Sequence, residues 1–129
     1  MRWRSARATI HRVGRSVLIV DDHAEFRRTL RALLEAEGFE VIGEAANGEA
    51  ALLAVQRLQP QLIVLDVQLP DLDGFEVAAR LAARRDPPAV ILTSSRSADS
   101  YRRRLANTSA VGFIAKSELS GEAVAALGG

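Results

Sequence analysis

Cysteine is absent from the 129-residue sequence, which excludes a disulfide framework and any metal or redox site built on thiolates. Long apolar runs are also missing, since none approaches the roughly 20 residues that a membrane-spanning helix needs. The arginine-rich start lacks the apolar stretch of a secretory signal. Together with an apolar fraction of 48% and a charged fraction of 26%, these absences predict one globular domain located in the cytoplasm.

Lysine is nearly absent, because Lys116 is the one lysine among 17 basic residues and all the others are arginines. The charges are unevenly spread, since residues 1–15 hold five arginines and no carboxylate, whereas residues 16–129 hold 12 basic and 16 acidic residues. We interpret residues 1–15 as a basic, disordered tail and residues 16–129 as the folded domain. Contact of this tail with nucleic acid or an anionic membrane is the less favoured reading.

Short aliphatic runs predict five β-strands, at residues 17–20, 41–45, 62–65, 89–92 and 111–115. Most of these runs are continuously apolar rather than alternating, which is typical of strands that are covered on both faces of a parallel sheet. Segments with helical spacing separate the runs. The strict alternation of strand and helix predicts a doubly wound α/β fold, with helices on both faces of a five-stranded parallel sheet.

Helix starts and stops support this pattern. The first helix should present an apolar stripe formed by Phe26, Leu30, Leu33 and Leu34. Asn47 is placed to cap the second helix, whose apolar face includes Leu58 and which Pro60 ends. Asp73 and Glu76 have the spacing of a capping box at the start of the third helix. Weaker helical patterns cover residues 97–106 and the residues from 120 onward.

Polar residues follow four of the predicted strands. These residues are Asp21 and Asp22, Asp66, Thr93 to Ser95, and Lys116. In a doubly wound sheet, ligands bind beyond the carboxyl ends of the strands, so we expect these groups to converge. Each alone is more often structural, as a helix cap or a strand end. Three carboxylates held together raise one another's pKa unless a cation joins them, and Mg²⁺ accepts such oxygen ligands.

Four segments of the sequence carry a family resemblance, namely VLIVDDH at 17–23, LIVLDVQLPDLDG at 62–74, VILT at 90–93 and GFIAK at 112–116. Over residues 16–127 the chain resembles the receiver domains of bacterial two-component response regulators. The Asp22-His23 and Lys116-Ser117 pairs are most similar to the nitrate-response regulators. The resemblance implies a flavodoxin-like sheet with strand order 2-1-3-4-5.

The resemblance also implies a role for each group at the strand ends. Asp66 would accept a phosphoryl group from a phosphohistidine on a sensor histidine kinase or a phosphotransfer protein. Asp22, Asp66 and the backbone carbonyl of Gln68 would bind Mg²⁺ directly, and Asp21 would hold a coordinated water. Lys116 would pair its compact ammonium with a phosphoryl oxygen. The chain would then be a signalling phosphoprotein that catalyses its own phosphorylation and dephosphorylation, not an enzyme acting on other substrates.

The same resemblance implies a switch. The hydroxyl of Thr93 would move to the phosphoryl group, and Phe113 would fill the vacated space at a position where Tyr or His is commoner. The surface of helix 97–106, strand 111–115 and the last helix would be read by a downstream target protein, and is a candidate homodimer face. We also predict that Gln68 and Ser95, which flank the site, set the dephosphorylation rate.

Three features have plainer interpretations. The segment Asp71–Gly74 resembles the phosphatase motif of haloacid-dehalogenase enzymes, but it follows Pro70 in a loop, so we set that activity aside. We expect His23 to be a surface imidazole, because a hard Mg²⁺ ion prefers oxygen ligands. We interpret residues 102–104, three consecutive arginines, as a solvated helix face rather than a partner-binding patch.

Because the sequence stops at Gly129 soon after the last helix, we expect a single-domain regulator without an output domain, whose output passes through another protein. Two alternatives remain at this point. The chain could be a fragment of a longer DNA-binding regulator, or an adaptor or dimerisation module that keeps the fold without phosphorylation. The complete set of strand-end groups argues against the adaptor.

Overall fold

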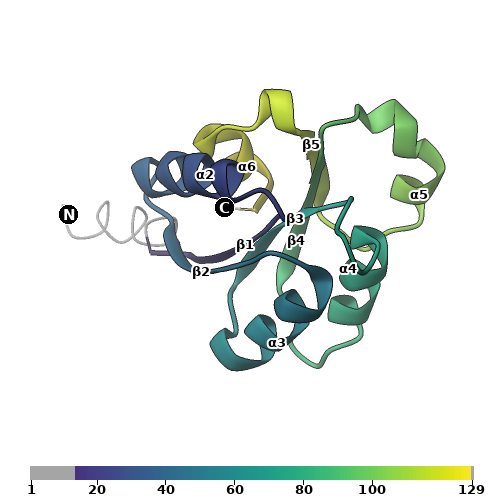
Figure 1. The fold of residues 1–129 in the computed structure, drawn as a ribbon, viewed down its shortest axis with the longest axis horizontal. Coiled ribbons are helices and arrows are strands. Elements are labelled where there is room, and N and C mark those ends of the chain that lie inside the picture. Colours follow the sequence, from purple (N-terminus) through teal and green to yellow (C-terminus); the bar gives the residue numbers. More distant parts are fainter. Residues whose placement is uncertain (1–13, 129) are drawn as a thin grey trace, which may run out of the picture.

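The computed structural model describes residues 14–128 of the chain. Its sheet has five parallel strands in the order β2-β1-β3-β4-β5. The strands are β1 (Ser16–Val20), β2 (Glu40–Ala45), β3 (Leu62–Asp66), β4 (Ala89–Ser94) and β5 (Gly112–Ala115). This arrangement, drawn in Figure 1, confirms the predicted doubly wound fold and its strand order.

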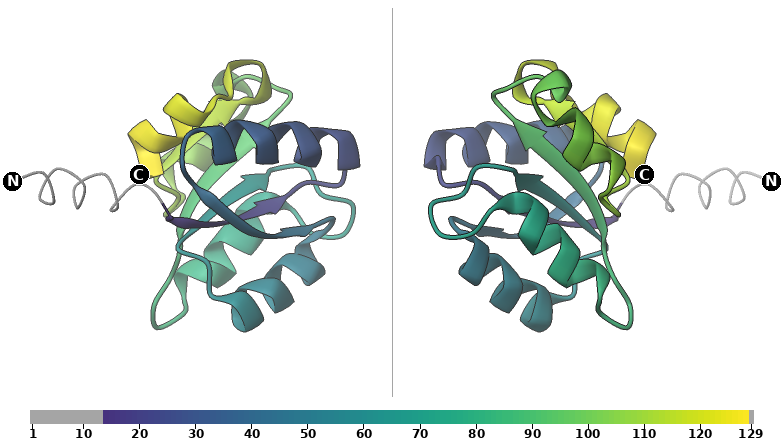
Figure 2. Two further views of the ribbon diagram at one scale, coloured as in Figure 1. Left: turned by 90° about the vertical axis from the view of Figure 1, so that its left-hand side faces the viewer. Right: turned by 90° about the vertical axis from the view of Figure 1, so that its right-hand side faces the viewer.

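Helices cover both faces of the sheet, as the two side views in Figure 2 show. The α-helices are α2 (Ala24–Ala36), α3 (Gly48–Leu58), α4 (Gly74–Ala82), α5 (Arg102–Ala106) and α6 (Gly121–Gly128). Two 3₁₀ turns, η1 (Ala98–Tyr101) and η2 (Lys116–Glu118), precede α5 and α6. Helices α2 and α6 pack on one face, while α3, α4 and the η1–α5 segment pack on the other.

The central strands bury side chains into two separate cores. In β1, Val17 and Ile19 join the core beneath α2 and α6. Leu18 and Val20, which point the opposite way, join the core beneath α3 and α4. All four side chains are at most 1% exposed. A strand that is buried on both faces has no solvent side on which to place polar residues, which explains the continuous apolar runs.

Two leucines that the helical patterns placed on apolar stripes are exposed instead. Leu33 of α2 is 39% exposed and Leu58 of α3 is 44% exposed. Each lies at the margin of its helix's buried face, which is narrower than the apolar pattern suggested. Leu58 reaches over the edge strand β2, where a Cβ added to Gly43 would stand 2.7 Å from the Leu58 side chain.

The predicted helix caps are confirmed at Asn47 and only half confirmed at Asp73. The Asn47 side chain accepts a hydrogen bond from Ala50 N at 2.8 Å, and that of Asp73 accepts one from Phe75 N at 2.7 Å. The capping box is wrong in its second half, because Glu76 pairs with Arg80 at 3.0 Å. The backbone of Asp73 is itself paired with that of Gln68 in an isolated β-bridge.

Two further expectations concern the basic tail and membrane-spanning helices. Of the basic segment 1–15, only Gly14 and Arg15 are described, so the predicted tail lies almost entirely outside the described residues. Within residues 14–128, no helix combines the length and the apolarity that crossing a membrane would require.

Candidate functional site

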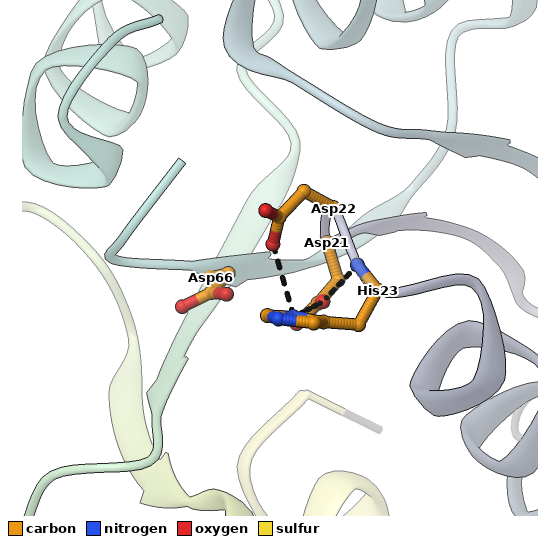
Figure 3. Close-up of side chains that lie close together, drawn as sticks. All are labelled: Asp21, Asp22, His23 and Asp66. Carbon is orange, nitrogen blue, oxygen red and sulfur yellow. Dashed lines mark hydrogen bonds and ion pairs between the residues drawn. The ribbon is translucent and has the colours of Figure 1, made fainter. Parts of the chain in front are cut away.

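The carboxyl ends of adjacent parallel strands bring the predicted polar groups together. Asp21 and Asp22 follow β1, Asp66 ends β3, Thr93 lies in β4, and Lys116 follows β5. Figure 3 shows Asp21, Asp22, His23 and Asp66 around one point, and the possible ligand atoms of these four residues lie within 4.8 Å of one another. The sequence prediction that these groups converge at one sheet edge therefore agrees with the structure.

Lys116 is set between two buried carboxylates. Its Nζ lies 2.6 Å from Oδ2 of Asp21 and donates a hydrogen bond to Oδ2 of Asp66 at 3.2 Å. The ammonium also stands 4.4 Å from the centre of the Phe26 ring, a cation–π contact. The side chain of Lys116 is 17% exposed, against 1% and 3% for the two aspartates. The chain's single lysine is thus the cation that faces this pair of buried acids.

Burial and neighbouring charges shift the pKa values of Asp66 and Asp21 in opposite directions. Burial raises the pKa of Asp66 to about 6, an effect that the nearby charge of Asp21 reinforces and that Lys116 and the Gln68 backbone only partly offset. Burial acts in the same direction on Asp21, but Lys116 and the backbone N–H of His23 outweigh it and lower the pKa of Asp21. One proton or one added cation would therefore relieve the repulsion between these carboxylates.

The donor set fits a hard divalent cation. Oδ2 of Asp21 is buried and accepts no hydrogen bond from the described residues, so it faces Lys116 as an ion pair only. The Gln68 backbone N–H donates to Oδ1 of Asp66 at 3.0 Å, which places that residue beside the acid cluster. Oxygen atoms from three carboxylates, among them the buried Oδ2 of Asp21, match the ligands that Mg²⁺ takes in proteins.

His23 contacts this cluster more closely than the sequence suggested. Its side chain is 68% exposed, as expected for a surface imidazole, but Nδ1 lies 3.0 Å from Oδ1 of both Asp21 and Asp22. The backbone N–H of His23 also donates to Oδ1 of Asp21 at 2.8 Å. His23 therefore orients the two aspartates that follow β1.

Arg27 is a neighbour of the site that the sequence did not indicate. Its Nη1 donates a 2.6 Å hydrogen bond to the backbone carbonyl of Asp21, and its Nε bonds to Glu44 at 2.9 Å. Glu44 also pairs with Arg31 at 2.8 Å. These contacts attach α2 to the end of β1 and to β2. No short sequence motif marks residues that pair across such separations.

The hydroxyl of Thr93 is directed away from Asp66. It donates a 2.6 Å hydrogen bond to the backbone carbonyl of Ile114 in β5, and the residue is 1% exposed. Phe113, the preceding residue in β5, is half-buried, and its ring centre lies 5.8 Å from that of Tyr101. The Tyr101 hydroxyl in turn shares a 2.8 Å hydrogen bond with Oγ of Ser94. Nothing in the sequence pattern indicates this contact between Tyr101 and Ser94.

The loop after Asp66 is held by close backbone contacts. Val67 N donates to Thr93 O at 2.9 Å, and Gly74 N donates to Val67 O at 2.8 Å. A Cβ on Gly74 would lie 2.7 Å from the Cα of Val67 and directly against the carbonyl oxygen of Asp66. Gly74 therefore has to lack a side chain for α4 to start this close to the site. Gln68 in this loop and Ser95 after β4 are both exposed.

The three consecutive arginines differ in their contacts. Arg102 is 82% exposed and pairs with Asp99 at 3.3 Å, as a solvated face would. Arg104 is different, because it pairs with Asp73 at 2.6 Å and stands 4.2 Å from the centre of the Phe75 ring. All three arginines are exposed, in agreement with a solvated face, and Arg104 in addition connects α5 to the start of α4.

Comparison with known proteins agrees with this geometry. Residues 17–127 match the family described as response regulator receiver domain. The virulence-factor transcription regulator BvgA of Bordetella pertussis is 44% identical over 102 residues, which cover 79% of this chain and 49% of that protein. The transcriptional regulatory protein PdtaR of Mycobacterium tuberculosis is 37% identical over 91 residues, which cover 70% of this chain and 44% of that protein. The chain thus spans about half or less of the length of these relatives.

Solved structures of receiver domains have a similar fold. The receiver domain of the response regulator NarL from Mycobacterium tuberculosis is 32% identical, with a TM-score of 0.76 over 87% of this chain and 94% of that one. The response regulator domain of Thermotoga maritima CheB is 28% identical, with a TM-score of 0.71 over 89% of this chain and 90% of that one.

Proposed function

Because the chain belongs to the response regulator receiver domain family, we propose that Asp66 accepts a phosphoryl group from a phosphohistidine on a sensor kinase or phosphotransfer protein in the cytoplasm. The observation that carries this proposal is the position of Asp66. Its carboxylate is buried at a strand end, has a pKa raised to about 6, and faces Lys116 across 3.2 Å. A buried acid that needs positive charge is suited to receive a phosphoryl group together with a cation.

The transfer exchanges one bond for another. A carboxylate oxygen of Asp66 attacks the phosphorus, the phosphorus–nitrogen bond to the imidazole breaks, and an acyl phosphate forms. The ammonium of Lys116, already at the carboxylate, pairs with an oxygen of the incoming group without a large movement.

Asp22, Asp66 and the carbonyl of Gln68 would hold Mg²⁺ directly, with Asp21 binding through a coordinated water. When bound, Mg²⁺ supplies positive charge that offsets the charge of the transferring phosphoryl group. The residues of the chain position the reactants around it. His23 and Arg27 keep the Asp21–Asp22 segment in place through the contacts to its carboxylates and backbone.

Switching would follow from the new charge on Asp66. The hydroxyl of Thr93 would leave the carbonyl of Ile114 and bond a phosphoryl oxygen, which is a stronger, charge-assisted partner. Phe113 would then turn into the space beside β4. The surface formed by η1, α5, β5 and α6 would change its shape, and a downstream target protein or a second copy of the chain would recognise it.

Intact-mass measurement tests the phosphoryl transfer. Incubation with Mg²⁺ and acetyl phosphate should add the mass of one phosphoryl group, and Asp66→Asn or removal of Mg²⁺ should abolish the addition. Asp86→Asn changes an exposed carboxylate in the segment before β4 and should keep the addition. A folded, Mg²⁺-binding protein that gains no mass would contradict the proposal and favour an adaptor that works without phosphorylation.

Gln68 and Ser95 are proposed to set the lifetime of the acyl phosphate. Both side chains are exposed beside the site, one on each of two neighbouring loops. Gln68→Ala and Ser95→Ala should change the dephosphorylation rate after the phosphodonor is removed, with little change in the extent of phosphorylation. Ser109→Ala, at another exposed serine, is the control, and identical rates in all proteins would refute this assignment.

A further inference from the structure

The carboxylate of Asp71 joins two parts of the chain that are far apart in the sequence. Oδ1 of Asp71 accepts a hydrogen bond from Gly48 N at 2.7 Å, and Oδ2 accepts one from Glu49 N at 2.9 Å. A third bond, from Leu72 N to Oδ1 at 2.8 Å, stays within the loop. Asp71 therefore connects the loop that follows Asp66 to the first residues of α3.

These bonds satisfy N–H groups that the helix itself cannot. The first N–H groups of an α-helix have no acceptor within the helix. In α3, the side chain of Asn47 accepts from Ala50 N, and the side chain of Asp71 accepts from Gly48 N and Glu49 N. A negative charge at this position is also favoured by the helix dipole. The start of α3 is thus capped twice, once from its own chain segment and once from the loop beside Asp66.

The loop that carries Asp71 is short and closed on itself. Its two ends meet in the β-bridge between Gln68 and Asp73, and Gly74 N bonds to Val67 O. Its apex rests on α3, since a Cβ on Gly48 would stand 2.8 Å from the Cβ of Leu72. A loop held at its base and at its apex has little freedom to move. Gln68 lies at the base of this loop, and Asp71 anchors its apex.

We propose that Asp71 is a positioning residue for the metal site, because its anchor on α3 fixes the loop that offers the Gln68 carbonyl to Mg²⁺. This inference rests on the proposed function, which assigns Gln68 as a ligand. Asp71 acts at a distance from the ion, since its two oxygens are occupied by backbone N–H groups. The same bonds explain why the Asp71–Gly74 motif is not a phosphatase nucleophile here.

Magnesium titration of the full chain without a phosphodonor tests the inference. The dissociation constant for Mg²⁺ is followed from backbone amide shifts in ¹H–¹⁵N spectra of the wild type, Asp71→Ala, Asp71→Asn and Asn47→Ala. We expect Asp71→Ala to weaken Mg²⁺ binding by roughly tenfold, the lower end of what removal of an outer support typically costs. Asp71→Asn keeps one acceptor oxygen and should lie between Asp71→Ala and the wild type.

Asn47→Ala is the matched control, because it removes the other cap from the same helix end without touching the loop. It should lower the stability of the fold and leave the Mg²⁺ dissociation constant unchanged. An unchanged constant in both Asp71 variants, or an equal change in Asn47→Ala, would overturn the positioning role. A wild-type protein that binds no Mg²⁺ would overturn the proposed metal site as well, so the two failures are distinguishable.

Discussion

The hydroxyl of Thr93 is bonded to the carbonyl of Ile114 at 2.6 Å, although Thr93 is the register partner of Asp66 across β3 and β4. Thr93 therefore lies beside the proposed phosphoacceptor but bonds in the opposite direction, toward β5. A phosphoryl group on Asp66 would compete with Ile114 for this hydroxyl. The hydrogen bond between Thr93 and Ile114 is thus the contact that the proposed switch has to break.

Thr93→Val should separate phosphorylation from switching. Valine keeps the shape but has no hydroxyl, so Asp66 should still gain a phosphoryl group while the resonances of Phe113 no longer shift on phosphorylation. Loss of the hydrogen bond should cost about 1 kcal/mol of unfolding free energy in urea. Thr29→Val, at an exposed position of α2, is the control. A Phe113 shift as large as in the wild type would show that Thr93 is not the switch.

The pKa of Asp66 predicts a pH-dependent effect of Asp66→Asn. Because its pKa is about 6 in the folded protein and 3.8 as the ordinary value, the folded state binds the proton more tightly. Stability of the metal-free wild type should therefore fall as pH rises from about 4 to about 6. Asparagine cannot ionise and avoids this loss. In EDTA at neutral pH, Asp66→Asn should be more stable by about 1–3 kcal/mol.

Urea unfolding at two pH values checks this expectation. Near pH 4.5 the wild-type Asp66 carboxyl is largely protonated in the folded state. The gain in unfolding free energy of Asp66→Asn over the wild type should therefore be much smaller there than at neutral pH. Asp86→Asn changes an exposed carboxylate and should show no such pH-dependent gain. An advantage that is equal at both pH values would contradict the raised pKa.

Tyr101 and Ser94 should show strong coupling in a double-mutant cycle. Their hydroxyls share a buried 2.8 Å hydrogen bond. Tyr101→Phe or Ser94→Ala leaves one buried hydroxyl with fewer partners, which should lower the free energy of unfolding by about 1–3 kcal/mol. The double variant should lose less than the sum of the two single losses. Ser94 also accepts from Arg96 N at 3.1 Å, so Ser94→Ala should be the more costly single change. Additive effects measured by thermal unfolding would argue against the bond.

Gly74→Ala should destabilise the fold and disturb Asp66, because the added methyl group meets the backbone of Asp66 and Val67. We expect a loss of about 1–3 kcal/mol, typical of overpacking, and a reduced phosphorylation rate. Gly112→Ala is the comparison, since its methyl group meets only the partly exposed, flexible side chain of Leu127, 2.6 Å away. Chemical denaturation of both variants gives the measurement, and equal stabilities would refute the constraint at Gly74.

The sequence was most informative where a residue's position along a strand decides its place in the fold. Runs such as residues 62–65 predicted buried parallel strands, and the residues after them were predicted to converge, because parallel strands end at one edge of the sheet. Lys116, unusual as the single lysine, was predicted to belong to the same group, and it lies between Asp21 and Asp66.

Contacts made by loops and exposed helix faces were not predictable in this way. Asp71 meets α3 at residues 22 and 23 positions earlier in the chain, and Arg27 meets the carbonyl of Asp21 from the side of α2. Neither partner follows from periodicity, because each depends on how a loop turns or how a long side chain extends. The same holds for Leu33, whose exposure depends on how α2 is rotated over the sheet.

Parallel strands also separate the two ends of the described chain from the acid cluster. Ser16 begins β1, and Gly128 packs against Leu62, the first residue of β3, so both lie toward the end of the sheet opposite Asp66. An affinity handle, fluorophore or sensor surface attached near either position would leave the acid face open to solution. Immobilised protein is therefore suited to testing the proposed kinase docking and the proposed metal binding directly.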